Sequence, residues 1–563
     1  MYSRVNSNLL EDRLDAEFYS LEQIKNHKTL QDYGVIPLSA YCNGINVGYT
    51  GELTSVYRAQ GTTLFRVSDI DGIFLSNDDV NYVPDDFAAN NPQIWIRDND
   101  IVFAAVGNTI GKVALKTVSM PDGVCSRALM IARPLTDKID SSFLIAYLAT
   151  KYAQKSLLRG VSGSAQPVLN TPLIANLPVI SAESVSQKYI GDKVRQAEQL
   201  RVWAKRLYRI PAFIDAFIQG ALPLSLTDLL FSLIKKSNND AIKELTKFLA
   251  LNIEDAQMKQ NFQGFIEKNK MGSVDIEREF FHINTVSTSA IEDFLSAQTY
   301  RPAITDAFDK ITSKKFSTLQ SISLEPIRQG ATPKFSAIGK KCIKSKQTRD
   351  LFLDETGYEI VDPNDEQNKR IVRLKRNDIL VTRQGAGTVG RASIFLDDEE
   401  TYITDSLFLV RIDPAKANPA FVAGFLRSYT GQRLIEKGVY GSTGQLNLSS
   451  TALRNIPILD VPLEFQNFLG ETLCTADTLF KLSTRLTQSA KTLVEALIEG
   501  QLTEQQLIQA QQALEDGDNS LDQAILSKLS AEGYAIEGAT PLFSDVDELY
   551  RLLEEAAQAE AEE

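Results

Sequence analysis

Histidine and cysteine are scarce in this chain, which holds two histidines and four cysteines among its 563 residues. No CxxC pair occurs, and the cysteines lie far apart at Cys42, Cys125, Cys342 and Cys474. Zinc sites built from cysteine and histidine are therefore not expected. Neither His27 nor His282 lies near a serine or cysteine motif, so a histidine-based catalytic triad is not expected either.

Long apolar stretches are also missing. No window holds 18 consecutive apolar residues, so a membrane-spanning helix is not expected. The first residues lack the basic segment and following apolar run that mark a secretory signal. Together these absences favour a reduced, cytoplasmic protein without a membrane partner.

The net charge of −13 comes from one end of the chain. Residues 501–563 contain 2 basic and 15 acidic residues, which leaves 57 of each in residues 1–500. The acidity of the whole chain is therefore no argument against nucleic-acid binding by its main part. The acidic end itself is typical of a solvated helical face, with a DNA-mimicking or autoinhibitory role as the alternative.

The sequence contains an internal repeat, in which motifs of the first half return in the second half with a shift of about 280 residues. Asp100–Lys112 returns as Asp378–Arg391, and Gln187–Gly191 returns as Gln466–Gly470. Further matches follow in the same order: Glu11–Tyr19 with Glu292–Tyr300, Gly163–Leu169 with Gly441–Leu448, Asn176 with Asn455, and Phe213–Gly220 with Leu493–Gly500. The chain is a duplicated protein.

Each copy has the same internal plan. Short β-type runs broken by glycine, asparagine and aspartate come first, with one amphipathic helix expected at 143–158 and at 421–436. A long helix follows, whose apolar residues recur about every 3.5 positions in both copies. We expect the two long helices to pack against each other as a rod of about 50 Å. The alternative is two helices that each lie on their own domain.

One motif is typical of cofactor binding but is better explained otherwise. Gly385, Gly387 and Gly390 form a GxGxxG pattern, yet a second strand follows where dinucleotide binding needs a helix. The other copy loses the pattern between Gly107 and Gly111, and it also fails as a phosphate-binding loop. A hairpin turn with glycines at positive φ explains both copies. No cofactor is expected on this chain.

The repeat and its flanks predict an α+β chain of seven parts. Two mixed α/β domains alternate with long antiparallel coiled-coil-like helices, and a helical insertion and an acidic helical tail are added. The predicted parts are an arm at 1–19, a first domain at 20–182, a first long helix at 183–220, the insertion at 221–283, a second domain at 284–460, a second long helix at 461–500 and the tail at 501–563. Leu502–Leu514 and Asp545–Glu563 are the two helices expected in the tail.

In this order, twice over, the motifs resemble those of the specificity subunits of type I restriction–modification systems. The marks are Arg13–Tyr19, the Asp-Ile hairpin with its glycines, the Gly-Ser segment followed by Asn176 or Asn455, and the closing helices. The resemblance implies two target-recognition domains that each read half of a bipartite, gapped site in double-stranded DNA. It also implies two docked adenine-N6 methyltransferase subunits, which bind S-adenosylmethionine, and nuclease–translocase subunits when DNA is cut. The chain itself would carry no catalytic residue.

Candidate DNA-binding residues are the cations near the repeated hairpin and in one basic run. They are Arg66, Lys112 and Arg127 in the first copy, and Lys341, Lys344, Lys346, Arg349, Arg383 and Arg391 in the second. The alternative for the run at 340–349 is a strand edge protected by lysines. Gln166 and Gln445 are repeated, which favours a structural role over base reading.

Two other functions stay open at this stage. One is a self-sufficient nuclease or methyltransferase with an unrecognised active site. The other is a non-catalytic scaffold of a phage-defence complex.

Overall fold

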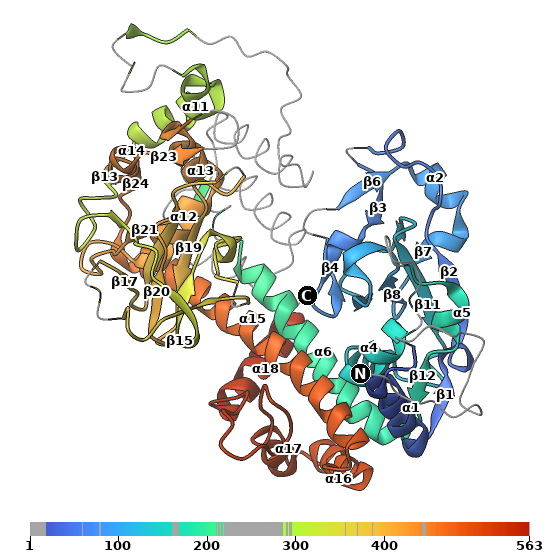
Figure 1. The fold of residues 1–563 in the computed structure, drawn as a ribbon. Helices are drawn as coiled ribbons and strands as arrows, with labels where there is room; N and C mark the ends of the chain where they lie inside the picture. The colour runs from blue at the N-terminus through green and yellow to red at the C-terminus, as the bar shows by residue number, and fades with distance from the viewer. Residues whose placement is uncertain are drawn as a thin grey trace. The chain divides into compact units, whose positions relative to one another are not determined.

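In the computed structural model the chain forms two compact units (Figure 1). One takes in the described residues up to Val202 and those from Leu479 to Glu560, and the other takes in those from Trp203 to Thr478. The structure describes residues 18–58, 60–77, 80–159, 161, 168–209, 211, 214–215, 218, 285–288, 291, 296–354, 356–366, 368, 370–385, 387–441 and 446–561. The insertion at 221–283, most of the arm at 1–19, Gln166 and Gln445 lie outside these residues.

The first unit contains a head built from two main sheets, here called the first head (residues 18–182). One sheet has the order β6-β3-β10-β7, and the other has the order β2-β11-β8-β9-β5-β4. A small pair, β1 with β12, joins the two ends of the head. The strands are β1 (Val35–Pro37), β2 (Cys42–Val47), β3 (Thr62–Phe65), β4 (Ile70–Asp71), β5 (Phe74–Leu75), β6 (Asn81–Val83), β7 (Trp95–Ile96), β8 (Ile101–Ala104), β9 (Val113–Leu115), β10 (Gly123–Cys125), β11 (Leu129–Pro134) and β12 (Pro178–Ile180).

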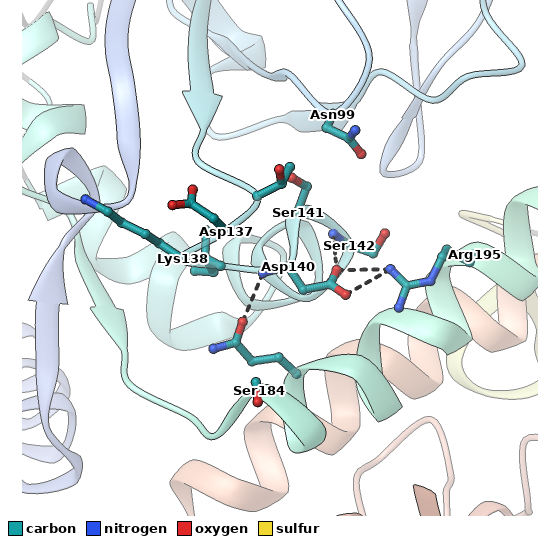
Figure 2. Close-up of a pocket in the computed structure, with 11 residues that line it drawn as sticks. Asn99, Asp137, Lys138, Asp140, Ser141, Ser142, Ser184 and Arg195 are labelled. Carbon is teal, nitrogen blue, oxygen red and sulfur yellow. Dashed lines mark hydrogen bonds and ion pairs between the residues drawn. The ribbon is translucent and has the colours of Figure 1, made fainter. Parts of the chain in front are cut away.

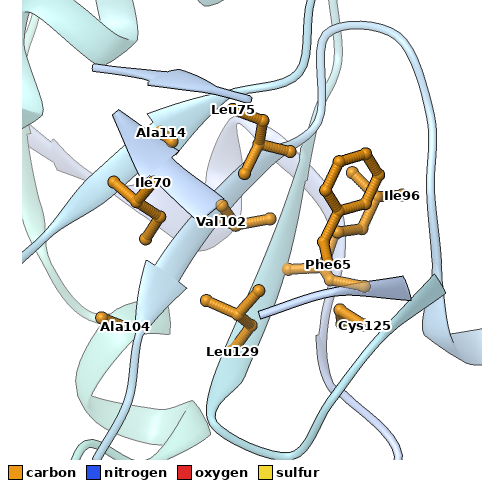
Figure 3. Close-up of a cluster of buried hydrophobic side chains, with 10 residues drawn as sticks. Phe65, Ile70, Leu75, Ile96, Val102, Ala104, Ala114, Cys125 and Leu129 are labelled. Atoms are coloured by element: carbon orange, nitrogen blue, oxygen red, sulfur yellow. The ribbon is translucent and has the colours of Figure 1, made fainter. Parts of the chain in front are cut away.

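The core of the first head lies between these sheets (Figure 3). Phe65 of β3 packs with Leu75, Val102 and Leu129, all of which are fully buried. The four-residue run Ile101–Ala104 is buried on both faces, which explains why it is apolar throughout. The helices of the head are α1 (Leu21–Tyr33), α2 (Asp85–Ala89), α3 (Ser141–Leu148), α4 (Lys151–Arg159) and α5 (Thr171–Ala175).

The second unit contains a head of the same topology, here called the second head (residues 296–460). Its sheets have the orders β16-β15-β20-β17 and β14-β21-β18-β19, which match β6-β3-β10-β7 and β2-β11-β8-β9 strand for strand. The strands are β13 (Phe316–Thr318), β14 (Arg328–Gln329), β15 (Phe335–Ile343), β16 (Glu359–Val361), β17 (Val372–Arg373), β18 (Asp378–Thr382), β19 (Ala392–Phe395), β20 (Thr401–Ile403), β21 (Leu407–Val410), β22 (Val439–Tyr440), β23 (Asn447–Leu448) and β24 (Pro457–Leu459). The helices are α11 (Pro302–Thr312), α12 (Pro419–Arg427), α13 (Tyr429–Lys437) and α14 (Ser450–Arg454). The predicted α+β duplication is confirmed.

A buried ion pair is repeated in the two heads. Arg133 donates to both oxygens of Asp100, and Arg411 donates to both oxygens of Asp378. Asp100 directly precedes β8 and Asp378 begins β18, and each is at most 2% exposed in its side chain. A buried carboxylate needs such a partner, because desolvation without one is costly. The pair explains why the Asp-Ile motif recurs in the sequence.

The single helix expected at 143–158 and at 421–436 is wrong in both copies. Two helices stand in its place each time, α3 with α4 and α12 with α13. The break falls at Thr150 and Ser428, whose side-chain oxygens accept from the main-chain N–H groups of Ala153 and Gly431. Hydroxyl side chains that cap a helix in this way compete with continuation of the preceding helix.

The long helices differ from each other in continuity. α15 (Leu463–Ile498) runs for 36 residues without a break, whereas α6 (Ser184–Leu207) ends after 24 residues. Pro211 explains the earlier end, because proline has no N–H to donate and its ring clashes with the carbonyl four residues before it. The first long helix predicted at 183–220 is therefore interrupted after Leu207, and part of its last stretch lies outside the described residues.

Within each unit the two long helices pack against each other, as the repeated apolar seams predict. In the first unit Ser483 of α15 donates to the carbonyl of Ala197 in α6 at 2.7 Å, while Ser186 near the start of α6 reaches Glu504 just beyond α15. The pairing of early α6 with late α15 makes the helices antiparallel there. In the second unit Leu473 of α15 and Ile214, which follows α6 in the first repeat, both lie near Gly424 of α12.

In each copy of the repeat, an acidic residue near the end caps the N-terminus of a helix in the head of the other copy. Asp215 accepts from the main-chain N–H groups of Tyr429 and Thr430, at 2.7 and 2.9 Å, at the start of α13. Glu495 accepts from the N–H of Lys151 at 2.8 Å, at the start of α4. Asp215 and Glu495 are themselves equivalent in the repeat. Each contact lies inside one unit, and each supplies a carboxylate to a positive helix N-terminus.

The acidic tail has three helices, one more than expected: α16 (Glu504–Glu515), α17 (Ser520–Leu526) and α18 (Val546–Ala561). It docks on α6 through Asp522, which pairs with Lys193 at 2.7 Å; both side chains are 1% exposed. The hydroxyls of Tyr189 and Tyr550 also donate to Asp522. Burial alone would raise the pKa of Asp522, but Lys193 and the two hydroxyls hold it below its ordinary value. The tail is thus more than a solvated face.

Candidate nucleic-acid interface

Three cations of the first head lie at one edge of its sheets. The parallel strands β3 and β10 end together at Phe65 and Cys125; Arg66 comes directly after β3, and Arg127 comes two positions after β10. The hairpin between β8 and β9 meets the same edge, because Ala105 donates to the carbonyl of Ala128 at 2.8 Å. Lys112 lies in that hairpin, where its carbonyl accepts from Ala104. The structure therefore brings together all three residues predicted from the sequence.

These three side chains have different surroundings. Arg66 is held by Asp69 in a two-point contact, with nitrogen–oxygen distances of 3.1 and 3.3 Å. Lys112 and Arg127 are exposed, and neither forms an ion pair with another described residue. An exposed cation without a carboxylate partner is the usual form of a phosphate contact.

The second head repeats this edge. Its parallel strands β15 and β20 end at Ile343 and Ile403, and Lys344 comes directly after β15. Arg383 joins the edge through its N–H, which donates to the carbonyl of Ser406 at 2.8 Å. The equivalences are Arg66 with Lys344 and Lys112 with Arg391. We call the two sets the basic edges: Arg66, Lys112 and Arg127 in the first head, and Lys344, Arg383 and Arg391 in the second.

The cations of the second basic edge are more tightly held. Lys344 pairs with Glu359 at 2.9 Å, and its amino group lies 4.7 Å from the centre of the Phe335 ring. Arg383 donates to the carbonyl of Asp405 at 2.9 Å, and Arg391 donates to that of Gly387 at 2.8 Å. All three side chains are half-buried. These side chains therefore stabilise the local turns, in addition to any contact that they make with a ligand.

The remaining predicted cations follow β15. Lys341 pairs with Glu399 at 2.5 Å, and Arg349 lies 3.8 Å from Asp354 while staying 72% exposed. Lys346 is exposed and has no ion pair among the described residues. Thr348, next to Arg349, contacts Thr382 at 2.7 Å, which places this segment beside the end of β18.

The alternative explanation of the basic run, a strand edge guarded by lysines, is wrong. β15 lies inside its sheet, with β16 on one side and β20 on the other. A central strand has no free edge to protect. The lysines instead meet carboxylates on neighbouring strands and loops, as Lys341 does with Glu399 and Lys344 with Glu359.

The glycine pattern forms a hairpin, as expected from the repeat. β18 pairs antiparallel with β19, and the turn between them holds Gly385, Gly387 and Gly390 at φ angles of 128°, 73° and 82°. Gly107 and Gly111 have φ angles of 77° and 95° in the first head. Side chains other than glycine are strained at such angles, so the motif is explained by the turn.

Sequence reasoning missed Asp405, which stands in the second head where Arg127 stands in the first. The signal was available in the repeat, because the shift of 278 residues that relates Asp100 to Asp378 also relates Arg127 to Asp405. Asp405 accepts a hydrogen bond from the Thr332 hydroxyl at 2.6 Å. The two basic edges are therefore alike in backbone but differ in charge.

A polar cavity of about 310 Å³ lies elsewhere in the first unit, between α3 and the start of α6 (Figure 2). Asp140 caps α3 by accepting from Ser142 and Phe143, and it pairs with Arg195 at 2.9 Å. Gln187 accepts from the N–H of Asp140 at 3.0 Å. Asn418 and Gln466 repeat that last contact in the second head. The arrangement is therefore a repeated structural joint.

Within the described part of the chain, no three His, Cys, Asp or Glu residues are grouped so that they could hold a metal ion. Among the described helices, none has the length and hydropathy needed to cross a bilayer.

Comparisons with known proteins agree with the resemblance seen in the repeated motifs. A 127-residue stretch is 27% identical to the specificity subunit of the type I restriction enzyme MjaVIII from Methanocaldococcus jannaschii. The match covers 22% of this chain and 29% of that protein, so the chain spans less than a third of the relative's length. No family model matches the chain.

Similar solved structures include two specificity subunits. The S subunit of a type I restriction–modification system from M. genitalium is 13% identical, with a TM-score of 0.35 over 83% of this chain and 96% of that one. The HsdS subunit from Thermoanaerobacter tengcongensis is 14% identical, with a TM-score of 0.26 over 83% and 97%.

Proposed function

We propose that this chain is the non-catalytic DNA-recognition subunit of a type I restriction–modification complex. Each head reads one half of a bipartite, gapped site in double-stranded DNA. The observation that carries the proposal is the repetition of one head with one basic edge, because two equivalent readers suit two half-sites. The stretch that matches a specificity subunit supports the same family.

The chemistry of the basic edges suits DNA in two ways. Lys112 and Arg127 of the first basic edge, and Lys346 close to the second, are exposed cations without carboxylate partners among the described residues, and such cations position a protein on phosphates. Turns at the ends of strands project from a rigid sheet, so their side chains are held well enough to read base edges in a groove. Because the main part of the chain is neutral overall, binding depends on these local sets.

Catalysis belongs to partner subunits in this proposal. Burial raises the pKa of Cys42 to about 12 and that of Cys342 to about 12, so neither thiol is available as a nucleophile near neutral pH. Two adenine-N6 methyltransferase subunits would dock on the chain and bind S-adenosylmethionine, and nuclease–translocase subunits would join them for cleavage. The proposed location is the cytoplasm, which suits four unpaired cysteines.

The test combines a cell experiment with reconstitution. Long-read mapping of modified bases in host DNA, with and without this gene, should lose N6-methyladenine at one gapped, two-part motif. Purified methyltransferase subunits should methylate that motif only when this chain is added. Methylation of the same motif without the chain would overturn the proposal. Activity of the chain alone on DNA with magnesium and labelled S-adenosylmethionine would favour the enzyme alternative instead.

A further inference from the structure

The two heads present equivalent turns at their basic edges. In the first head Leu129 donates to the carbonyl of Ser126 at 3.0 Å, which closes the turn that holds Arg127. In the second head Leu407 donates to the carbonyl of Thr404 at 3.3 Å, which closes the turn that holds Asp405. Arg127 and Asp405 are thus each the second residue of a four-residue turn.

The surroundings of the turns are also repeated. Ser126 donates to the carbonyl of Phe65, and Thr404 donates to that of Ile343, at 3.3 and 3.2 Å. A glycine backs each turn, because a Cβ at Gly48 would collide with the Ser126 carbonyl and one at Gly330 with the Thr404 carbonyl. The backbone positions of residues 127 and 405 are therefore the same in their two heads.

Their side chains have opposite charge. Arg127 is exposed, with no ion pair to any described residue, so its guanidinium can meet a ligand. Asp405 is half-buried; the Thr332 hydroxyl orients one carboxylate oxygen, and no described cation pairs with the carboxylate. Arg383 contacts the main-chain carbonyl of Asp405 at 2.9 Å and so fixes the turn itself.

We infer that residues 127 and 405 are equivalent specificity positions that read opposite hydrogen-bonding patterns. Arg127 donates to O6 and N7 of guanine in one half-site, and Asp405 accepts from N4 of cytosine in the other. A carboxylate at a DNA-facing turn is repelled by phosphate, so a base amino group is the partner that suits it. This inference rests on the proposed DNA recognition and adds to it the base classes at one position of each half-site.

The competing explanation is that Asp405 serves only its own turn by binding Thr332. Three variants separate the two explanations. Asp405→Asn keeps the size and the acceptor for Thr332 but adds a donor, which favours adenine. Asp405→Ala removes the acceptor altogether. Thr332→Val removes the orienting hydroxyl and leaves the carboxylate in place.

The experiment measures methylation by the reconstituted complex on duplexes randomised in both half-sites. Wild-type complex should prefer guanine at one position of the first half-site and cytosine at one position of the second, each by roughly ten- to a hundredfold. Asp405→Ala should abolish the cytosine preference, and Asp405→Asn should move it toward adenine. Arg127→Ala should abolish only the guanine preference, and Arg127→Lys should weaken it.

The untouched half-site is an internal control in every variant. A folding defect lowers methylation of all sequences, whereas loss of one reader flattens one position in one half-site. Unchanged base preference in both Asp405→Asn and Asp405→Ala, with methylation retained, would overturn the inference. The inference would also be overturned if Thr332→Val lowered methylation as much as Asp405→Ala does while neither variant changed the base preference. If methylation needs no specificity chain at all, the proposed function fails instead.

Discussion

The two heads differ in what they share and in what they do not. They have the same strand order, the same buried Asp–Arg pair and the same helix-end cap, and their basic edges have the same backbone. At those edges the side chains differ: Arg127 is equivalent to Asp405, and Lys112, which has no ion pair to any described residue, is equivalent to Arg391, which binds a backbone carbonyl. The repeated contacts named here are those that fold the head, whereas the side chains of the basic edges have changed.

The first long helix, α6, also binds the tail through residues that the second long helix, α15, does not share. Lys193 and Tyr189 of α6 bind Asp522, but the repeat places Thr472 and Phe468 at the equivalent positions of α15. Neither can form a buried ion pair with a carboxylate. The two long helices are thus equivalent in their seams and unequal in what they bind on the outside.

The largest effect is expected when the buried ion pair between α6 and the tail is removed. Lys193→Ala leaves the Asp522 carboxylate buried without its cation and should destabilise tail docking by about 3–5 kcal/mol. Limited proteolysis should then cut residues 501–560 much faster than in the unaltered chain. Lys188→Ala is the matched control, because its pair with Glu515 is exposed and should leave the cleavage rate unchanged. Equal rates of proteolysis in the two variants would contradict the role of the Lys193–Asp522 pair in docking the tail.

The next effect should be the same in both heads. Arg133→Ala and Arg411→Ala each leave a buried aspartate without its ion-pair partner and should cost about 2–3 kcal/mol of stability. Hydrogen exchange should show faster opening of β8 and β11 in one variant and of β18 and β21 in the other. A loss confined to one head would show that the repeated pair has unequal roles. The exposed Arg551 is a control position, expected to change neither head.

A smaller and unequal effect is expected at the helix-end caps. Asp215→Ala removes a buried acceptor for two N–H groups and should cost about 1–2 kcal/mol, whereas Glu495→Ala removes one and should cost about 0.5–1 kcal/mol. Thermal unfolding of the single variants measures both losses. Asp215→Asn keeps an acceptor oxygen and should recover much of the stability. An Asn variant as unstable as the Ala variant would assign the effect to charge.

The smallest effect concerns the salt dependence of DNA binding. Lys112→Ala should reduce the slope of log affinity against log salt concentration by about 1, because the lost cation is exposed and has no ion pair to any described residue. Arg391→Ala, the equivalent change in the second head, should alter the slope less, since that guanidinium is bound to the Gly387 carbonyl. Titrations of the reconstituted complex at several salt concentrations measure both. Equal slopes would remove the distinction between the two basic edges.

The sequence was sufficient for the duplication, the antiparallel helices and the hairpin glycines. Repeated spacing reports backbone geometry directly, which is why Gly385, Gly387 and Gly390 could be assigned to a turn rather than a cofactor loop. It was also sufficient to name Arg66, Lys112 and Arg127 as separate candidates. That they share one edge depends on the parallel pairing of β3 with β10, which the sequence does not show.

Other features depend on contacts that spacing does not contain. The break at Thr150 and Ser428 needs a side chain to bond its own backbone, and the lysines of β15 meet carboxylates from distant strands. Asp522 looked like one more acid in an acidic tail, but its partner Lys193 lies 329 residues away in the chain. Asp405 was overlooked because a search for cations passes over an acid.

The helix-end caps have a consequence for inheritance. Asp215 and Glu495 bind main-chain N–H groups of the heads. Every residue except proline offers such a group, so these hydrogen bonds do not depend on which side chain stands at positions 151, 429 and 430. A head can therefore change much of its sequence and keep this attachment to the long helix that holds it.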